Sequence, residues 1–243
     1  MKFCKIDLHV HTVLSPCGDL MMTPGNIINK ALKEDIEVLA ITDHNTAENI
    51  ATIMKMAEST PLHIIPGMEV ETREEVHILC LFETLEQILE WQQVIYKHLP
   101  DKNNIEDIFG PQIIVDENDQ YTAKLDRLLA TATNLSINEV VKKVEKRKGL
   151  VIPSHIDKNN GLIKNLGIIP ENLEIKVMEI FHKTNIEAYI NKFPFLQEKI
   201  LIKNSDSHYL KEINPKMALE LEEVSFKEVI KVLKEKKNRK LFL

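Results

Sequence analysis

The sequence is poor in the residues that build linkers, disulfides and base-stacking platforms. Only 7 of its 243 residues are Gly and 10 are Pro, which argues against low-complexity segments and long flexible linkers. Aromatic residues make up 5%, so the composition does not advertise a platform for stacking single-stranded bases. The three cysteines, Cys4, Cys17 and Cys80, have no C-x-x-C spacing. They fit a reducing cytoplasm better than a disulfide framework.

Long apolar runs and an excess of positive charge are also missing. No apolar run approaches the roughly 20 residues of a membrane span, and Lys2, Lys5 and Asp7 stand where a secretory apolar core would lie. We therefore expect a soluble, cytoplasmic protein without a membrane partner. The formal net charge is -6, and no basic block precedes the lysine-rich tail from Lys227 to Lys240. We therefore expect no long duplex nucleic acid as a partner. The oligomeric state is not fixed by the sequence.

What is present is enough apolar sequence for one large core, arranged in a regular alternation. Of the residues, 44% are hydrophobic, and short apolar runs alternate with amphipathic stretches. Strands are predicted at Phe3–Val10, Val38–Thr42, Leu62–Val70, Val76–Phe82, Leu150–His155, Lys176–Phe181 and Ile200–Asn204, and helices at Thr23–Glu34, Asn45–Ser59, Thr84–His98 and Phe226–Lys236. This alternation predicts an α/β fold of parallel β/α units, which favours a TIM-like barrel.

Residues 100–148 interrupt the alternation. Helical patterns cover Ala123–Ala132 and Ser136–Lys148, and Ser136 with Glu139 fits a capping box at the start of the second. We expect a small, mostly helical insertion or cap within one domain. Residues 1–99 and 149–243 would then form the barrel.

Polar residues recur where the predicted strands end. In the run D-x-H-x-H-T, Asp7, His9 and His11 share one face of the first strand, because side chains alternate along a strand. Six further candidates follow or lie in later strands: His44, Glu69, His77, His155, Asp206 and His208. The carboxyl ends of barrel strands are where such folds build active sites. Any one of these residues could be structural, but together they are too many for one zinc ion. They favour two or three metals bridged by a carboxylate.

The same residues resemble the ordered motifs of the PHP (polymerase and histidinol phosphatase) superfamily. The motifs are Asp7-x-His9-x-His11-Thr12, Thr42-Asp43-His44, Gly67-x-Glu69, His77, Ser154-His155 and Asp206-x-His208. The resemblance implies a distorted (β/α)7 barrel, a trinuclear site for Zn, Mn or Fe, and phosphoesterase activity. It also implies the ligand sets: His9, His11, Glu69 and Asp206 for one metal, Glu69, His77 and His155 for a second, and His44 and His208 for the third.

The loop after the first motif is expected to supply one more ligand. Its sequence is Ser15-Pro16-Cys17-Gly18-Asp19, slightly longer than the family's common version. Asp19 is the predicted further ligand of the third metal, and Cys17 is the rival because a thiolate binds zinc well. We expect Asp43, which points away from His44 along the strand, to support the site without binding metal.

The resemblance and the donor set predict a metal-dependent phosphoesterase. A metal-bridging hydroxide would attack phosphorus in the phosphate ester of a small metabolite, nucleotide or short oligonucleotide. The predicted catalytic residues are Glu69, Asp206 and His208, and the predicted substrate-binding residues are Lys158, His182 and Lys183. Two alternatives stay open. One is an amidohydrolase-type metal hydrolase, which also begins with H-x-H, although the early Glu69 disfavours it. The other is a non-catalytic, metal-dependent binding or regulatory protein.

Overall fold

The apolar runs and amphipathic stretches fold into strands and helices at most of the places that their patterns predict. The computed structural model describes residues 1–167, 173–181, 186–234 and 241–242. The strands are β1 (Lys2–Val10), β2 (Ile36–Ile41), β3 (His63–Glu71), β4 (His77–Leu81), β5 (Ile113–Val115), β6 (Tyr121–Lys124), β7 (Leu150–Pro153), β8 (Val177–Glu179), β9 (Ile200–Ile202), β10 (Met217–Leu221) and β11 (Leu241–Phe242). The helices are α1 (Pro24–Lys33), α2 (Ile50–Ala57), α3 (Leu85–His98), α4 (Glu106–Phe109), α5 (Ile137–Lys146), α6 (Leu162–Leu166), α7 (Ile186–Lys192) and α8 (Phe226–Lys234), with short 3-10 turns η1 (Pro194–Glu198) and η2 (Leu210–Glu212).

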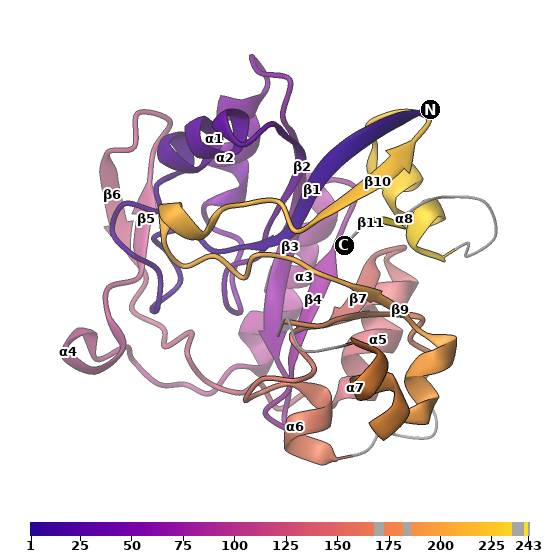
Figure 1. Cartoon of the computed structure of the whole chain (residues 1–243). Helices are drawn as coiled ribbons and strands as arrows, with labels where there is room; N and C mark the ends of the chain where they lie inside the picture. The colour runs from indigo at the N-terminus through magenta and orange to yellow at the C-terminus, as the bar shows by residue number, and fades with distance from the viewer. Residues whose placement is uncertain (168–172, 182–185, 235–240, 243) are drawn as a thin grey trace.

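One curled, mixed sheet organises the molecule as a half-barrel (Figure 1). Its strand order is β11-β10-β1-β2-β3-β4-β7, and β8 pairs with β9 in a separate parallel pair. Strands β1, β2 and β3 run parallel because α1 and α2 provide the crossovers. The predicted α/β class is confirmed. Closure into seven β/α units stays a prediction.

The curvature of the sheet creates an apolar interior. Fully buried Ile6 and Leu8 of β1 pack in one cluster with Val177 of β8 and Ile202 of β9. The seven-stranded sheet and the β8–β9 pair are separate sheets, but both therefore contribute to the same core. Phe226 of α8 packs into this cluster as well. Burying such side chains stabilises the fold by about 1.5–3 kcal/mol each.

Strand β4 departs from the predicted parallel arrangement. It runs antiparallel to both β3 and β7. The reason is the connection from β3, a tight turn in which the Thr72 N–H donates to the Val76 carbonyl at 3.0 Å. A turn this short can join only antiparallel strands, whereas a parallel neighbour needs a crossover. The β3–β4 hairpin brings His77 level with Glu71.

The region from residue 100 to residue 148 contains a β-hairpin as well as helices. The helix predicted over Ala123–Ala132 is wrong: its first two residues end β6, which pairs with β5, and loop residues follow. The hairpin is held by α2, because Asn49 accepts from the Val115 N–H at 3.2 Å and donates to the Ile113 carbonyl at 3.1 Å. In this segment, the cross-strand hydrogen bonds between β5 and β6 outweigh the local helical pattern. Whether the region acts as a cap stays a prediction.

Two helix starts follow the capping rules that the sequence shows. The predicted capping box of α5 is confirmed, with the Ser136 side chain accepting from the Glu139 N–H at 3.3 Å. A second box, Thr84 with Gln87, starts α3 and lets the fully buried Trp91 pack beside Phe82. Within the described residues, no helix combines the length and apolarity needed to cross a bilayer.

Candidate metal centre

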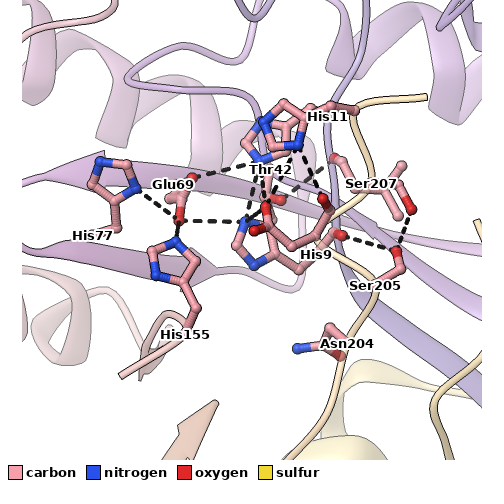
Figure 2. Close-up of polar contacts among 12 residues, drawn as sticks. His9, His11, Thr42, Glu69, His77, His155, Asn204, Ser205 and Ser207 are labelled. Carbon is pink, nitrogen blue, oxygen red and sulfur yellow. Dashed lines mark hydrogen bonds and ion pairs between the residues drawn. The ribbon is translucent and has the colours of Figure 1, made fainter. Parts of the chain in front are cut away.

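The ends of β1, β2 and β3 bring the predicted histidines and carboxylates together. Single parallel bridges join Val10 to Ser207 and His44 to Glu69. The His11 N–H also donates to the Ser207 carbonyl at 3.1 Å. Segments almost 200 residues apart in sequence therefore meet at the end of β1 (Figure 2).

Glu69 lies at the middle of the cluster. Its side chain is 1% exposed, and ring nitrogens of five histidines lie 3.2–3.5 Å from its two oxygens: His9, His11, His44, His77 and His155. Figure 2 shows several of these rings turned toward the carboxylate. Neither Glu69 oxygen has a hydrogen-bond partner among the described residues. A buried carboxylate in this state is costly unless a cation satisfies it.

Asp206 is the second carboxylate of the cluster. Its Oδ1 lies 3.3 Å from His9 Nε2 and 3.5 Å from His11 Nε2, and the two Nε2 atoms are 3.1 Å apart. Both Asp206 (φ 51°) and His155 (φ 25°) have left-handed backbone conformations. Such conformations cost about 1–3 kcal/mol and cluster at functional sites. These backbone conformations direct the side chains of Asp206 and His155 toward the cluster.

Hydrogen bonds behind the cluster fix which nitrogen of three imidazoles faces inward. The Nδ1 of His9 lies 3.0 Å from a Glu179 oxygen, and the Nδ1 of His208 lies 3.0 Å from the Asp206 carbonyl. Both acceptors require a proton on Nδ1, so Nε2 keeps its lone pair. The Nδ1 of His11 contacts Ser15 Oγ at 2.9 Å, and that hydroxyl donates to Asp43 at 2.7 Å. His11 must therefore donate as well. Oriented imidazoles of this kind are typical of metal ligands.

Asp43 supports the cluster from behind. Besides the Ser15 hydroxyl, it accepts the N–H and the hydroxyl of Thr12, both at 2.7 Å. These bonds give Thr12, which follows the second histidine of the motif, a structural role. In the structure, Asp43 holds the turn that carries His11.

The charge states suit cation binding. Burial lowers the pKa of His11 to about 3, helped by neighbouring His208, and burial also lowers the pKa of His44 well below its usual range. Both rings are therefore neutral at neutral pH. Burial opposes ionisation of Glu69, but His77 and His9 hold its pKa well below its usual range. Neutral imidazoles beside ionised carboxylates are the form that binds divalent metals.

His9 behaves differently. Although burial opposes the charged form, the carboxylates of Glu179, Glu69 and Asp206 raise its pKa well above the usual value. Its Nε2 faces two of these carboxylates. That position attracts a proton when no other cation is present.

Among the described residues, three groups of ligand atoms lie close enough to share an ion. They are His9–His11–Asp206, His44–Glu69–His77 and His11–His44–His208. The first contains three of the four residues that the resemblance implies for one metal, without Glu69, and the second places His44 with Glu69 and His77. His155 reaches Glu69 at 3.2 Å without belonging to these groups. The assignment of particular residues to particular ions stays a prediction.

The loop ligand stays a prediction too. Asp19 uses its carboxylate to accept the Met21 N–H at 2.9 Å, and its own N–H donates to the His208 carbonyl. Cys17 is exposed and borders a cavity beside Asp206. Both residues lie near the cluster, and within the described ranges neither belongs to the three groups above.

Lys158 lies at the mouth of the centre. Its Nζ is 2.7 Å from Asp206 Oδ2 and 3.9 Å from the centre of the Phe181 ring. Its role in substrate binding stays a prediction. The other two predicted substrate-binding residues, His182 and Lys183, lie outside the described residues.

Sequence reasoning missed Glu179 as a functional residue. It is fully buried at the end of β8 and accepts from His9, from Asn204 Nδ2 at 2.9 Å and from the His155 N–H at 3.3 Å. A single carboxylate inside the apolar run Val177–Ile180 was the available signal, since charged side chains are rarely fully buried without a partner.

The donor set defines a candidate metal centre, and comparison with known proteins identifies the family. The model of the PHP domain matches residues 7–136, more than half of the chain. The chain belongs to the PHP domain family. The predicted resemblance and the predicted hydrolase class are thereby confirmed.

Relatives match only in part. An uncharacterised protein of Methanocaldococcus jannaschii is 35% identical over 102 residues, which are 38% of this chain and 60% of that protein. The 5'-3' exoribonuclease Rnm of Salmonella typhimurium is 35% identical over 80 residues, which are 31% of this chain and 26% of the exoribonuclease. The chain therefore spans less than two thirds of these relatives.

Two solved structures share the fold of this chain over almost its whole length. The lesion-specific endonuclease PfuEndoQ from Pyrococcus furiosus has a TM-score of 0.78 at 19% identity, covering 100% of this chain and 58% of the endonuclease. Endonuclease Q in complex with a 27-mer duplex, with an abasic lesion at the active site, has a TM-score of 0.72 at 17% identity, covering 98% and 58%. At this identity the likeness concerns the fold.

The expectation of no long duplex partner is wrong. It rested on the net charge of the whole chain, yet a protein of the same fold is seen with a duplex at its active site. Net charge averages the entire surface, whereas nucleic acid responds to the local potential. Here four lysines border the cavity beside Asp206: Lys158, Lys203, Lys211 and Lys216.

Proposed function

We propose that this protein is a metal-dependent phosphoesterase that hydrolyses phosphodiester bonds of nucleic acid. Family membership supports the phosphoesterase part. The nucleic-acid part is supported by the partial match to an exoribonuclease and by the shared fold with an endonuclease. A partial match to a phosphoribosyl 1,2-cyclic phosphate 1,2-diphosphodiesterase, 31% identical over 80 residues, makes a small phosphodiester the second candidate substrate.

The observation that carries the proposal is the state of Glu69. Its carboxylate is buried, ionised at neutral pH, surrounded by five ring nitrogens and without a hydrogen bond among the described residues. A structural carboxylate would accept N–H or O–H donors, as Asp43 and Glu179 do. A carboxylate that binds cations needs no hydrogen-bond donors, because the cations satisfy its oxygens. The residues present therefore fit a cluster of metals.

We assign the cluster two to three divalent ions. His9, His11, Glu69 and Asp206 would hold one, Glu69 with His77 and His155 would hold a second, and His44 and His208 with Asp19 or Cys17 would hold the third. Imidazole and carboxylate donors suit Zn, Mn and Fe. Such ions lower the pKa of water toward 7 and neutralise phosphoryl oxygens.

The chain's own residues supply the remaining functions. Lys158 contacts Asp206 and lines the small cavity over Glu69, so its ammonium group is placed to contact a phosphoryl oxygen there. Glu69 and Asp206 supply the negative charge that retains the ions. His208 is half-buried at the opening, where its Nε2 would help to hold the third ion.

Metal content measured together with hydrolysis tests the proposal. Protein purified without chelators should contain two to three metals per chain by elemental analysis. It should hydrolyse bis(p-nitrophenyl) phosphate and a labelled oligonucleotide, and a chelator should abolish both activities. Metals without hydrolysis of either diester would refute the phosphoesterase. One metal or none, with no rescue by added Mn or Zn, would refute the centre itself.

A further inference from the structure

A large cavity adjoins the metal centre. A small cavity of about 150 Å³ lies over Glu69, and a larger one of about 1090 Å³ lies beside it. The two share Lys158, Asp206 and His208 as lining residues, so they are adjacent. Pockets for drug-sized ligands measure about 300–1,000 Å³. The larger cavity therefore offers more room than one scissile phosphate needs.

The larger cavity is basic, in contrast to the chain as a whole. Lys203, Lys211 and Lys216 line it and come from the segment between β9 and β10 that also carries Asp206. Among the described residues, no carboxylate lies within ion-pair distance of these three lysines. Of the acids lining the cavity, Glu212 already accepts the N–H groups of His208 and Tyr209. The free positive charge is thus directed at the cavity.

An exposed aromatic ring lies on the same wall. Tyr209 is 46% exposed and directly follows His208. The Lys211 Nζ lies 5.4 Å from the centre of its ring. An exposed ring flanked by cations and next to a phosphate-cleaving centre is suited to stack an unpaired base.

We propose that this cavity binds the single strand that flanks the scissile phosphate, with Tyr209 stacking on an unpaired base and Lys203, Lys211 and Lys216 contacting backbone phosphates. The proposal rests on the proposed function, because the strand is placed relative to the bond that the centre cleaves. It names unpaired nucleic acid as the ligand of this surface. A phosphorylated metabolite would leave most of the cavity unfilled.

The test compares substrates of different length in the full chain. The substrates are bis(p-nitrophenyl) phosphate, a dinucleotide, and DNA and RNA single strands of about 12 nucleotides, a usual site size. Wild type should prefer the longer strands. Tyr209→Ala should lower the ratio of kcat/KM for the long strand over that for the small diester by at least about fivefold, and Tyr209→Phe should restore it.

The lysines are tested through salt dependence. Replacing Lys203 and Lys216 by Gln should reduce the slope of log affinity against log salt by about 1.4, roughly 0.7 per lost phosphate contact on a single strand. The control replaces Lys142 and Lys146 by Gln, because both are exposed on α5, away from the cavity. This control should leave affinity and slope unchanged.

Two measurements separate this proposal from the proposed function. If wild type hydrolyses no diester, the proposed function fails, and fluorescence anisotropy of the labelled strand still tests the cavity. Equal kcat/KM for dinucleotide and long strand, or Tyr209→Ala binding the strand as wild type does, would overturn the cavity proposal. The proposal would also be overturned if Tyr209→Ala lost as much affinity for a duplex of the same length as for the single strand, because paired bases cannot stack on Tyr209.

Discussion

Glu179 offers the sharpest test of how the centre is organised. Its carboxylate receives three N–H donors, from the His9 ring at 3.0 Å, the Asn204 amide at 2.9 Å and the His155 backbone at 3.3 Å. Two of these partners belong to proposed ligand residues. Glu179 therefore orients His9 and His155 without contacting the metals itself.

The substitution Glu179→Gln keeps the size of the side chain and changes its hydrogen bonding. A carboxylate can accept all three donors, whereas an amide must turn its NH2 toward at least one of them. The cost of that mismatch is about 1–3 kcal/mol. Loss of the charge also weakens the hydrogen bond from His9 Nδ1–H to residue 179, which makes the lone pair of Nε2 less basic and therefore a weaker metal ligand. We expect metal affinity to fall about 10–100-fold.

Competition with a chromophoric chelator measures the affinity of metal-free protein for Zn or Mn. Urea unfolding of the metal-free variant shows whether the fold itself is weakened. The matched control is Glu174→Gln, which removes the same charge from an exposed position just before β8. Wild-type affinity in Glu179→Gln, or an equal loss in Glu174→Gln, would refute the positioning role.

Three further outcomes are expected. Glu69→Gln should lose bound metal and lower diester hydrolysis at least about 100-fold while circular dichroism stays native, whereas His63→Asn, at the far end of β3, should change activity less than about twofold. A chelator should lower the Tm of wild type and leave that of Glu69→Gln unchanged, because only a chain that binds metal is stabilised by it. Asp119→Ala should lower the free energy of unfolding in urea by about 1 kcal/mol, because Asp119 accepts the Gly25 N–H at 3.0 Å at the start of α1. Asp101→Ala, which is exposed, should cost less than about 0.5 kcal/mol, and equal losses would contradict the capping role.

The residues of the cluster could be predicted because they follow local rules. Alternation along β1 puts His9 and His11 on one face, and strand ends of an α/β fold meet at one edge. Those rules need no knowledge of distant contacts. They place the side chains in one region, and the structure brings Glu69 within 3.2–3.5 Å of five histidines.

Other features depend on partners far away in sequence and could not be read from local pattern. The segment around Ala123 has a helical pattern, yet β6 forms because β5 pairs with it and Asn49 holds β5. Glu179 reads as one polar residue in an apolar run, and its role appears only when β8 lies behind His9. The net charge likewise gave no sign that Lys203, Lys211 and Lys216 line one wall of the cavity.

The centre also joins two segments that lie almost 200 residues apart in the sequence. The Leu8 N–H donates to Asn204 Oδ1 at 2.9 Å and the Ser205 N–H donates to Asp7 at 3.1 Å, so the segment after β9 is bound along β1 by neutral and charged hydrogen bonds. These bonds deliver Asp206 and His208 to the histidines of β1. Buried, like-charged carboxylates repel each other, and a divalent ion between them converts that repulsion into attraction. Metal binding should therefore stabilise the contact between β1 and the segment after β9, and that segment also forms the basic wall of the cavity. A cation at Asp206 would thus complete the centre and fix the strand-binding surface in the same step.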